Sequence, residues 1–210
     1  MEHVFESYQW KTPFTAVVAG PTSCGKTQFI FRFIKHVNQL MSPPPSDIVY
    51  CYGAWQDGFN TLKNVQFHEG LPDKSLLKQN RLLIIDDLMN EASDSSVVDL
   101  FTKHSHHSNV SVVFVAQNFF HKNLRNITLN AHYIILFKSP RDQSQISHLA
   151  RQMYPRDSKY LVEAFKDATE RAYGYLMIDL KADTNDNHRL RTFVFPDENG
   201  IVYVPRKKIE

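Results

Sequence analysis

Short apolar segments alternate along the chain with segments whose apolar residues recur at helical spacing. Several of the apolar segments are nearly continuous, without the polar alternation of a half-exposed strand, and they span residues 14–19, 48–52, 82–85, 110–116 and 132–137. Continuous apolar strands are typical of a parallel sheet that helices cover on both faces. The pattern therefore predicts an α/β fold with a mostly parallel central sheet. A weaker segment, 65–68, is predicted as a short edge strand.

Helical spacing predicts the segments that cover this sheet. The first helix follows strand 14–19 and ends before Ser42-Pro43-Pro44-Pro45, because proline cannot continue a helix. Its inward face comprises Phe29, Ile30, Phe33, Ile34 and Val37. A second helix is predicted over 91–104, with Val97, Val98, Leu100 and Phe101 facing inward. Two more are predicted over 143–153 and 157–169, on either side of Pro155.

The pattern changes after residue 172. Segments 173–180, 190–195 and 201–204 are predicted as three short strands, and Asn199-Gly200 is a turn signal between the last two. No internal repeat is apparent. We predict a core over residues 1–172 and a small C-terminal β extension of the same domain over residues 173–210.

Composition adds limits on the class of protein. The 210 residues are 42% hydrophobic and 22% charged, which is typical of a globular chain rather than a disordered one. Net charge is only +2, so coating of nucleic acid by a strongly basic surface is not expected, although this charge does not exclude a local basic groove. Two cysteines suggest a reducing compartment. With no secretory signal and no apolar run of ~20 residues, we expect a soluble intracellular protein without a membrane partner.

The strongest chemical signal lies between the first strand and the first helix. There the chain fits GxxxxGK[ST] in full, with the residues Gly20-Pro21-Thr22-Ser23-Cys24-Gly25-Lys26-Thr27. Glycines let the backbone wrap closely around a phosphate, while loop N–H groups and the helix N-terminus supply positive potential. In this P-loop, or Walker A motif, we expect Lys26 to reach the β- and γ-phosphates of ATP and Thr27 to bind Mg²⁺.

An acidic pair ends the third strong strand. In Leu82–Asp87 an apolar strand carries Asp86 and Asp87 to the carboxyl edge of the sheet, where ligands bind in such folds. This Walker B-like strand predicts Asp86 as a Mg²⁺ ligand through water and Asp87 as the group that orients the attacking water. A helix N-cap is the competing role for Asp87, and Glu91 is the alternative base.

Two further sets of residues complete the predicted site. Gln117 ends the next strand, where its amide can reach the γ-phosphate or the water, or simply face solvent. An arginine is commonly needed at a γ-phosphate, and the candidates are Arg125, Arg141 and Arg151. Arg125 and Arg141 flank the fifth strand and could act in the site of a neighbouring subunit.

Basic residues near the C-terminus suggest a contact with the backbone of nucleic acid. They are Arg189, Arg191 and the run Arg206-Lys207-Lys208. A charge run is more often a solvated tail, so both interpretations remain open.

Taken together, these motifs resemble the HerA–FtsK superfamily of additional-strand P-loop ATPases with a RecA-like fold. Lys26 precedes Asp86 by 60 residues, enough for an extra strand between the motif strands, and a polar Gln117 ends the following strand. The chain also resembles the genome-packaging ATPases of Polintons, adintoviruses, virophages and poxviruses. Three segments carry this resemblance: Pro13-Phe14 through Gly20-Pro21-Thr22, Ser105-His106-His107 through Gln117-Asn118-Phe119-Phe120, and Leu124-Arg125-Asn126-Ile127 through Phe137-Lys138-Ser139-Pro140-Arg141-Asp142. The resemblance covers about residues 10–155, and nothing comparable is recognised beyond residue 172. Asp87 stands where the superfamily often has glutamate.

The resemblance implies a ring-forming homo-oligomeric ATPase that drives double-stranded DNA into a preformed viral capsid. ATP and Mg²⁺ are the implied cofactors, with Gln117 sensing the γ-phosphate. A capsid or portal-like vertex is the implied partner, in the host nucleus, a cytoplasmic virus factory or the virion.

Three other functions share parts of the pattern. A viral replicative helicase of superfamily 3 has the same loop and acidic strand, but no origin-binding or primase-like domain is visible in this chain. A nucleotide-switched capsid-assembly scaffold needs the acidic pair and Gln117 less. A small-molecule kinase commonly carries a lid segment, which the pattern does not show.

Overall fold

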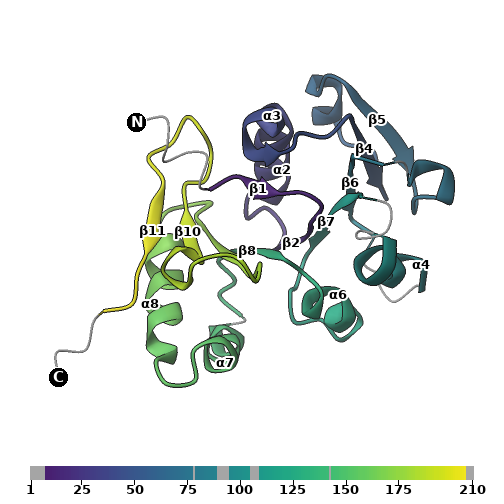
Figure 1. Ribbon diagram of the computed structural model, residues 1–210. Coiled ribbons are helices and arrows are strands. Elements are labelled where there is room, and N and C mark those ends of the chain that lie inside the picture. The colour runs from purple at the N-terminus through teal and green to yellow at the C-terminus, as the bar shows by residue number, and fades with distance from the viewer. Residues whose placement is uncertain (1–7, 78, 89–94, 105–108, 142, 207–210) are drawn as a thin grey trace.

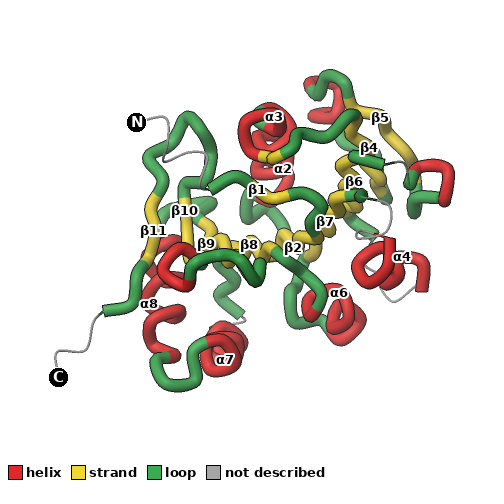
Figure 2. Tube along the Cα trace, viewed as in Figure 1, coloured by secondary structure: helices red, strands yellow, loops and turns green. Residues whose placement is uncertain are grey.

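One large sheet organises the computed structural model, which describes residues 8–77, 79–88, 95–104, 109–141 and 143–206. Within these residues, nine strands pair in the order β11-β10-β9-β8-β2-β7-β6-β4-β5, and the sheet crosses the middle of the molecule (Figure 2). The strands are β2 (Thr15–Ala19), β4 (Asp47–Tyr52), β5 (Val65–Glu69), β6 (Arg81–Asp86), β7 (Ser111–Ala116), β8 (Tyr133–Phe137), β9 (Tyr175–Asp179), β10 (Leu190–Thr192) and β11 (Ile201–Tyr203). A separate pair joins β1 (Trp10–Lys11) to β3 (Met41–Ser42).

Strand directions confirm the predicted α/β class. The six strands from β8 to β5 are mutually parallel, whereas β9, β10 and β11 pair antiparallel. The weak segment 65–68 is indeed an edge strand, β5. Because β2, β7, β6 and β8 are parallel, all four end at the same edge of the sheet, which we term the carboxyl edge.

Helices cover both faces of the sheet (Figure 1). One face carries α2 (Lys26–Lys35) and α3 (Val37–Leu40), whose buried residues pack with Trp10 and Phe14. The other carries α4 (Ser95–Asp99), α6 (Arg125–Leu129), α7 (Gln143–Met153) and α8 (Ser158–Ala168), with a π-helical turn over Leu100–His104. Short 3₁₀ turns lie at Asp57–Thr61, Lys74–Leu76, Lys122–Leu124 and Asp186–His188. No helix in these described ranges has the length and apolar character needed to cross a membrane.

The predicted helices form with two corrections. The first breaks at His36 between α2 and α3 and ends at Leu40, before the prolines. In the helix predicted over 91–104, Val98 is only half-buried. Helical spacing directs Val97 and Phe101 toward the core and leaves Val98 at the edge of the buried face. The start of that predicted helix, 91–94, lies outside the described residues.

The C-terminal strands extend the same sheet beyond β8. Buried Arg191 on β10 pairs with Asp179 on β9 at 2.6 Å. The predicted turn at Asn199-Gly200 is wrong: the link from β10 to β11 turns earlier, where the N–H of Glu198 donates to the carbonyl of Phe195. Burial of the Phe195 ring against α2 accounts for the longer link. The boundary at residue 172 stays a prediction.

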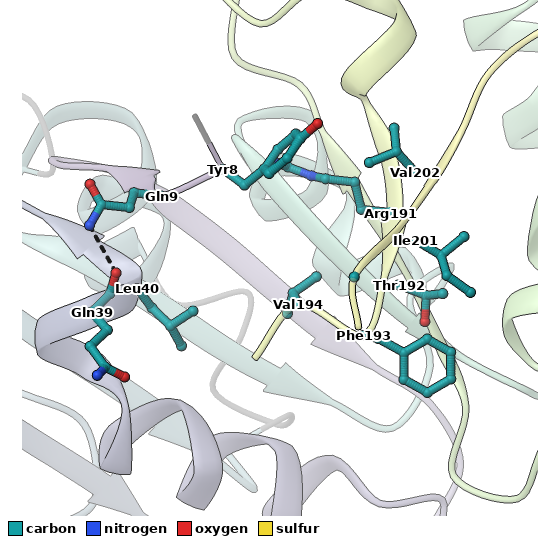
Figure 3. A pocket seen from close by; sticks show the side chains of 11 residues that line it. Tyr8, Gln9, Gln39, Leu40, Arg191, Thr192, Phe193, Val194, Ile201 and Val202 are labelled. Carbon is teal, nitrogen blue, oxygen red and sulfur yellow. Dashed lines mark hydrogen bonds between the residues drawn. The ribbon is translucent and has the colours of Figure 1, made fainter. Parts of the chain in front are cut away.

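A mostly apolar pocket of about 120 Å³ separates this arm from the N-terminal segment (Figure 3). Its lining includes Tyr8, whose ring lies against Arg191, and Leu40, which lies on the side of Val194. None of the residues of the phosphate-loop motif or the acidic pair lines this pocket.

Candidate nucleotide-binding site

The phosphate loop leaves the carboxyl edge directly after β2. Gly20 donates its N–H to the carbonyl of Ala116 at 3.2 Å, which ties the start of the loop to the end of β7. A Cβ at this glycine would lie 2.6 Å from Cβ of Phe137 and 2.7 Å from Sγ of Cys24. Such contacts are closer than side chains tolerate, so only glycine fits here.

The backbone of the loop is shaped to present N–H groups. Ser23 and Gly25 both have left-handed φ angles, 63° and 109°, which produce the concave turns that bind anions. Gly25 is also the N-cap of α2 and contributes no capping side chain. The first N–H groups of this ten-residue helix are therefore not capped by a side chain and suit a phosphate group.

Lys26 lies over this loop. Its Nζ donates to the carbonyl oxygens of Gly20 at 2.7 Å and Pro21 at 2.8 Å, so the ammonium group is held above the concave turn. Burial raises the pKa of the Cys24 thiol, although the charge of Lys26 opposes this effect. The thiol is thus not an activated nucleophile, which agrees with a small tolerated residue inside the loop.

Asp86 ends β6 on the face that carries α2. Leu82 and Ile84 on this strand pack against that face, and alternation along the strand directs Asp86 the same way. The side chain is buried, and its Oδ2 accepts a 2.6 Å hydrogen bond from the hydroxyl of Tyr50 on β4. Burial raises the pKa of the Asp86 carboxyl; the bond from Tyr50 lowers it, and among the charges Asp87 raises it and Lys26 lowers it.

Asp87 continues the chain in an exposed position with a left-handed φ of 59°. Gly53 holds this turn, because its N–H donates to the carbonyl of Asp86 and a Cβ there would lie 2.7 Å from the carbonyl oxygen of Asp87. The following helix is described from Ser95 onward, so an N-cap role for Asp87 is not tested, and Glu91 lies outside the described residues.

Strand order brings the predicted groups together. β7 lies between β2 and β6, with Ala19 level with Ala116 and Asp86 level with Val115. The loop and the acidic pair are therefore two strand spacings apart, roughly 10 Å. Gln117, which is exposed at the end of β7, lines a small cavity of about 20 Å³ together with Gly20. Lys26 and Asp86 are close enough for their charges to interact.

Within the part of the chain that the structure describes, Arg151 is engaged in a hydrogen bond, whereas no side-chain hydrogen bond or ion pair is found for Arg125 or Arg141. Arg125 begins α6 and Arg141 follows β8; both are exposed, and neither lines the cavities beside the loop. Arg151 bonds its own helix through the carbonyl of Ser147.

Of the two interpretations of the C-terminal basic residues, neither a contact with nucleic acid nor a solvated side chain holds for Arg191, which is 5% exposed. Arg189 likewise binds Asp186 and two backbone carbonyls. Arg206 is exposed, and Lys207 and Lys208 lie outside the described residues.

Sequence patterns missed Tyr50 and Tyr173. The sequence pattern places Tyr50 only within a buried strand, and its one signal is a hydroxyl in an otherwise apolar segment. Tyr173 lies next to the loop, with its Cβ 3.2 Å from where a Cβ on Gly25 would be. No local pattern links residues so far apart in the chain.

Comparison with known families decides the relationship. The model of the poxvirus A32 protein family matches residues 57–202, well over half of the chain. The chain belongs to the poxvirus A32 protein family. The matched span includes Asp86, Asp87 and Gln117 and extends through β10 into β11. It corrects the expectation that nothing recognisable lies beyond residue 172. No curated protein matches the chain significantly.

Solved structures share the fold of this family member. The genome packaging NTPase B204 from Sulfolobus turreted icosahedral virus 2, in complex with sulfate, has a TM-score of 0.55 and 13% identity over 92% of this chain and 97% of that chain. Its complex with AMPPCP has a TM-score of 0.52 and 14% identity, over 92% of this chain and 98% of that chain. A structure of B204, the DNA-packaging ATPase from Sulfolobus turreted icosahedral virus, has a TM-score of 0.50 and 14% identity, also over 92% of this chain and 98% of that chain. At this identity the likeness establishes the fold, that of a P-loop NTPase.

Proposed function

We propose that this chain is an ATP-hydrolysing motor that translocates double-stranded DNA into a viral capsid. The observation that carries the proposal is the meeting of the phosphate loop, Asp86 and Gln117 at one edge of the sheet, in a member of the poxvirus A32 protein family. B204, which has the same fold, is a genome packaging NTPase. Neither a helicase nor a scaffold is favoured by these relationships.

The loop residues Gly20–Thr27 bind the triphosphate of ATP through backbone N–H groups and the N-terminus of α2. When the triphosphate binds, Lys26 exchanges its two carbonyl partners for β- and γ-phosphate oxygens. A charge-assisted contact with phosphate is stronger than one with a neutral carbonyl, which favours the exchange.

Mg²⁺ fits the groups present near the loop. Thr27 offers a hydroxyl oxygen and Asp86 a carboxylate, and hard oxygen ligands are what Mg²⁺ prefers. Among the described residues, no group of three or more His, Cys, Asp or Glu side chains is arranged to hold a metal by itself. Such a sparse donor set suits an ion bound largely by phosphates and water, where it would neutralise charge developing on the phosphate oxygens.

Hydrolysis needs a group to orient water at the γ-phosphate. Asp87 is exposed beside Asp86 and performs this role in the proposal, while the amide of Gln117 contacts the γ-phosphate. The left-handed turn at Asp87 keeps its backbone against Gly53. Glu91 remains the alternative base.

A subunit ring completes the site in this proposal. Arg125 or Arg141 enters the site of a neighbouring subunit and offsets charge in the transition state, an effect worth about 10³–10⁵ in rate. Neither guanidinium has an ion-pair partner in the part of the chain that the structure describes, and both lie in segments that follow the carboxyl edge.

The DNA track is recognised through its phosphates, so binding is expected to fall steeply with salt and to be independent of sequence. The motor acts at a capsid or portal-like vertex in the host nucleus or a cytoplasmic virus factory, and it can remain with the virion.

An ATPase assay with and without duplex DNA, run beside a measurement of particle mass, tests the proposal. We expect stimulation by duplex DNA in a ring-sized particle and no hydrolysis by Lys26→Ala. Unwinding of a forked duplex would instead favour a helicase. Hydrolysis retained by Lys26→Ala would reject the site.

A further inference from the structure

A second cavity, of about 390 Å³, adjoins the phosphate loop on the side away from Asp86. The volume lies in the range of small-molecule sites. Phosphate binding uses only the loop residues in its lining, which are Ser23, Gly25, Lys26 and Thr27. The cavity is lined by Ser23, Gly25, Lys26, Thr27, Gln28, Phe29, Arg32, Phe137, Tyr173, Tyr175 and Phe195.

Five of the eleven residues that line this cavity are aromatic. Phe29 on α2 packs edge-on against Tyr175 and Phe137, with ring centroids 4.9 and 6.1 Å apart, and lies 5.1 Å from Phe195. These four rings are buried and belong to one apolar cluster. They make a firm apolar surface beside a phosphate site, which suits a flat apolar ring better than a charged group.

Arg32 fixes one rim of the cavity. Its guanidinium bonds Asp197 and Glu198, each at 2.7 Å, and lies 4.2 Å from the ring centroid of Phe195. The loop between β10 and β11 is thus attached to α2. The positive charge of Arg32 is already paired with these two carboxylates, so Arg32 is not free to bind a phosphate.

Tyr173 differs from the other rings because it is 71% exposed. Its φ of 62° is left-handed, a conformation that a bulky residue rarely adopts. Strain of this kind persists where the surrounding structure imposes it, often at ligand sites. Here the tyrosine directly precedes Gly174, where an added Cβ would lie 2.4 Å from the carbonyl oxygen of Ala168. The tight turn holds the ring beside Gly25.

Strand order gives the bound nucleotide a direction. From β2, the sheet leads through β7 to Asp86 on one side, and through β8 to β9 and Tyr173 on the other. A triphosphate on the loop with its γ-phosphate toward Asp86 therefore directs its nucleoside toward the aromatic cavity.

We propose that this cavity takes the nucleoside of the bound nucleotide and that Tyr173 stacks on its base. The inference rests on the proposed function, because it assumes that the loop binds a nucleoside triphosphate. It assigns a role to the C-terminal extension, which would complete the nucleotide site through Tyr173, Tyr175 and Phe195.

Calorimetric titration with AMPPCP and with inorganic tripolyphosphate, both with Mg²⁺, tests the stacking. Tyr173→Ala is expected to weaken AMPPCP binding about 5- to 150-fold, the range for loss of one base–aromatic stack. Tyr173→Phe keeps the ring and should bind AMPPCP within twofold of the wild type. Tripolyphosphate has no base, so its affinity should not change in either variant.

The controls separate the two proposals. Unchanged AMPPCP binding by Tyr173→Ala would overturn the stacking, since the ring would then make no contribution to nucleotide affinity. An equal loss of tripolyphosphate binding would also overturn it, since the ring would then affect only the phosphate loop. Lys26→Ala should lose both ligands. If it retains both, the phosphate site itself is wrong. Thermal unfolding of Tyr173→Ala should match the wild type, because the side chain is mostly exposed.

Discussion

The hydrogen bond from Tyr50 to Asp86 offers a quantitative test of the site. Tyr50→Phe removes only the hydroxyl, which donates at 2.6 Å to a carboxyl buried at 6% exposure. A hydrogen bond to a charged group is worth about 1.5–3 kcal/mol, against about 0.5–1.5 kcal/mol for a neutral pair. At about 2–4 °C per kcal/mol for a chain of this size, we expect Tm to fall by about 3–12 °C at pH 7.

A double-mutant cycle with Asp86→Asn assigns the loss to this pair. In the Asp86→Asn background the partner is neutral, so Tyr50→Phe should cost only about 0.5–1.5 kcal/mol. Unfolding is followed by circular dichroism in urea and on heating. Tyr52→Phe is the matched control from the same strand, half-buried and with no hydroxyl hydrogen bond in the described structure, and should change stability by less than ~0.5 kcal/mol. An equal cost of Tyr50→Phe in both backgrounds would refute the pairing with an ionised carboxylate.

Lys26→Ala should abolish ATP hydrolysis while circular dichroism and Tm stay near those of the wild type; measurable turnover would contradict the role of the loop. Asp87→Asn should slow hydrolysis about 10²–10⁴-fold, the usual contribution of a general base, and leave nucleotide affinity within twofold; a normal rate would assign the water to another group. Because burial raises the pKa of Asp86, its ionisation opposes folding as pH rises through that pKa. Asp86→Asn should accordingly be more stable than the wild type at pH 7, with the difference disappearing as pH falls toward about 4, and a constant difference across this range would contradict the burial argument. Arg125→Ala or Arg141→Ala subunits mixed with Lys26→Ala subunits should regain part of the ATPase rate if the arginine acts across an interface, whereas mixtures that stay inactive for both would exclude that arrangement.

Much of the fold was predictable because its signals are local. Continuous apolar segments predicted five strands of the parallel region and a weaker segment predicted the edge strand β5. The 3.6-residue spacing of Phe29, Ile30 and Phe33 predicted the buried face of α2. The motif Gly20–Thr27 predicted a loop between strand and helix, which is where it lies. Local errors occurred where a distant contact prevailed, as at Asn199-Gly200, where the pairing of Arg32 with Asp197 and Glu198 accompanies a longer loop.

Local sequence was sufficient to predict the phosphate loop, the acidic end of β6 and the polar end of β7, because each depends on neighbours within a few residues. Only the tertiary structure placed β7 between β2 and β6, bonded Tyr50 to Asp86, buried Arg191 and set Tyr173 beside Gly25. The reason is physical: strand order and the burial of a charge follow from contacts between segments far apart in the chain. The energy of those contacts depends on how the whole sheet packs, and no local spacing of residues encodes it.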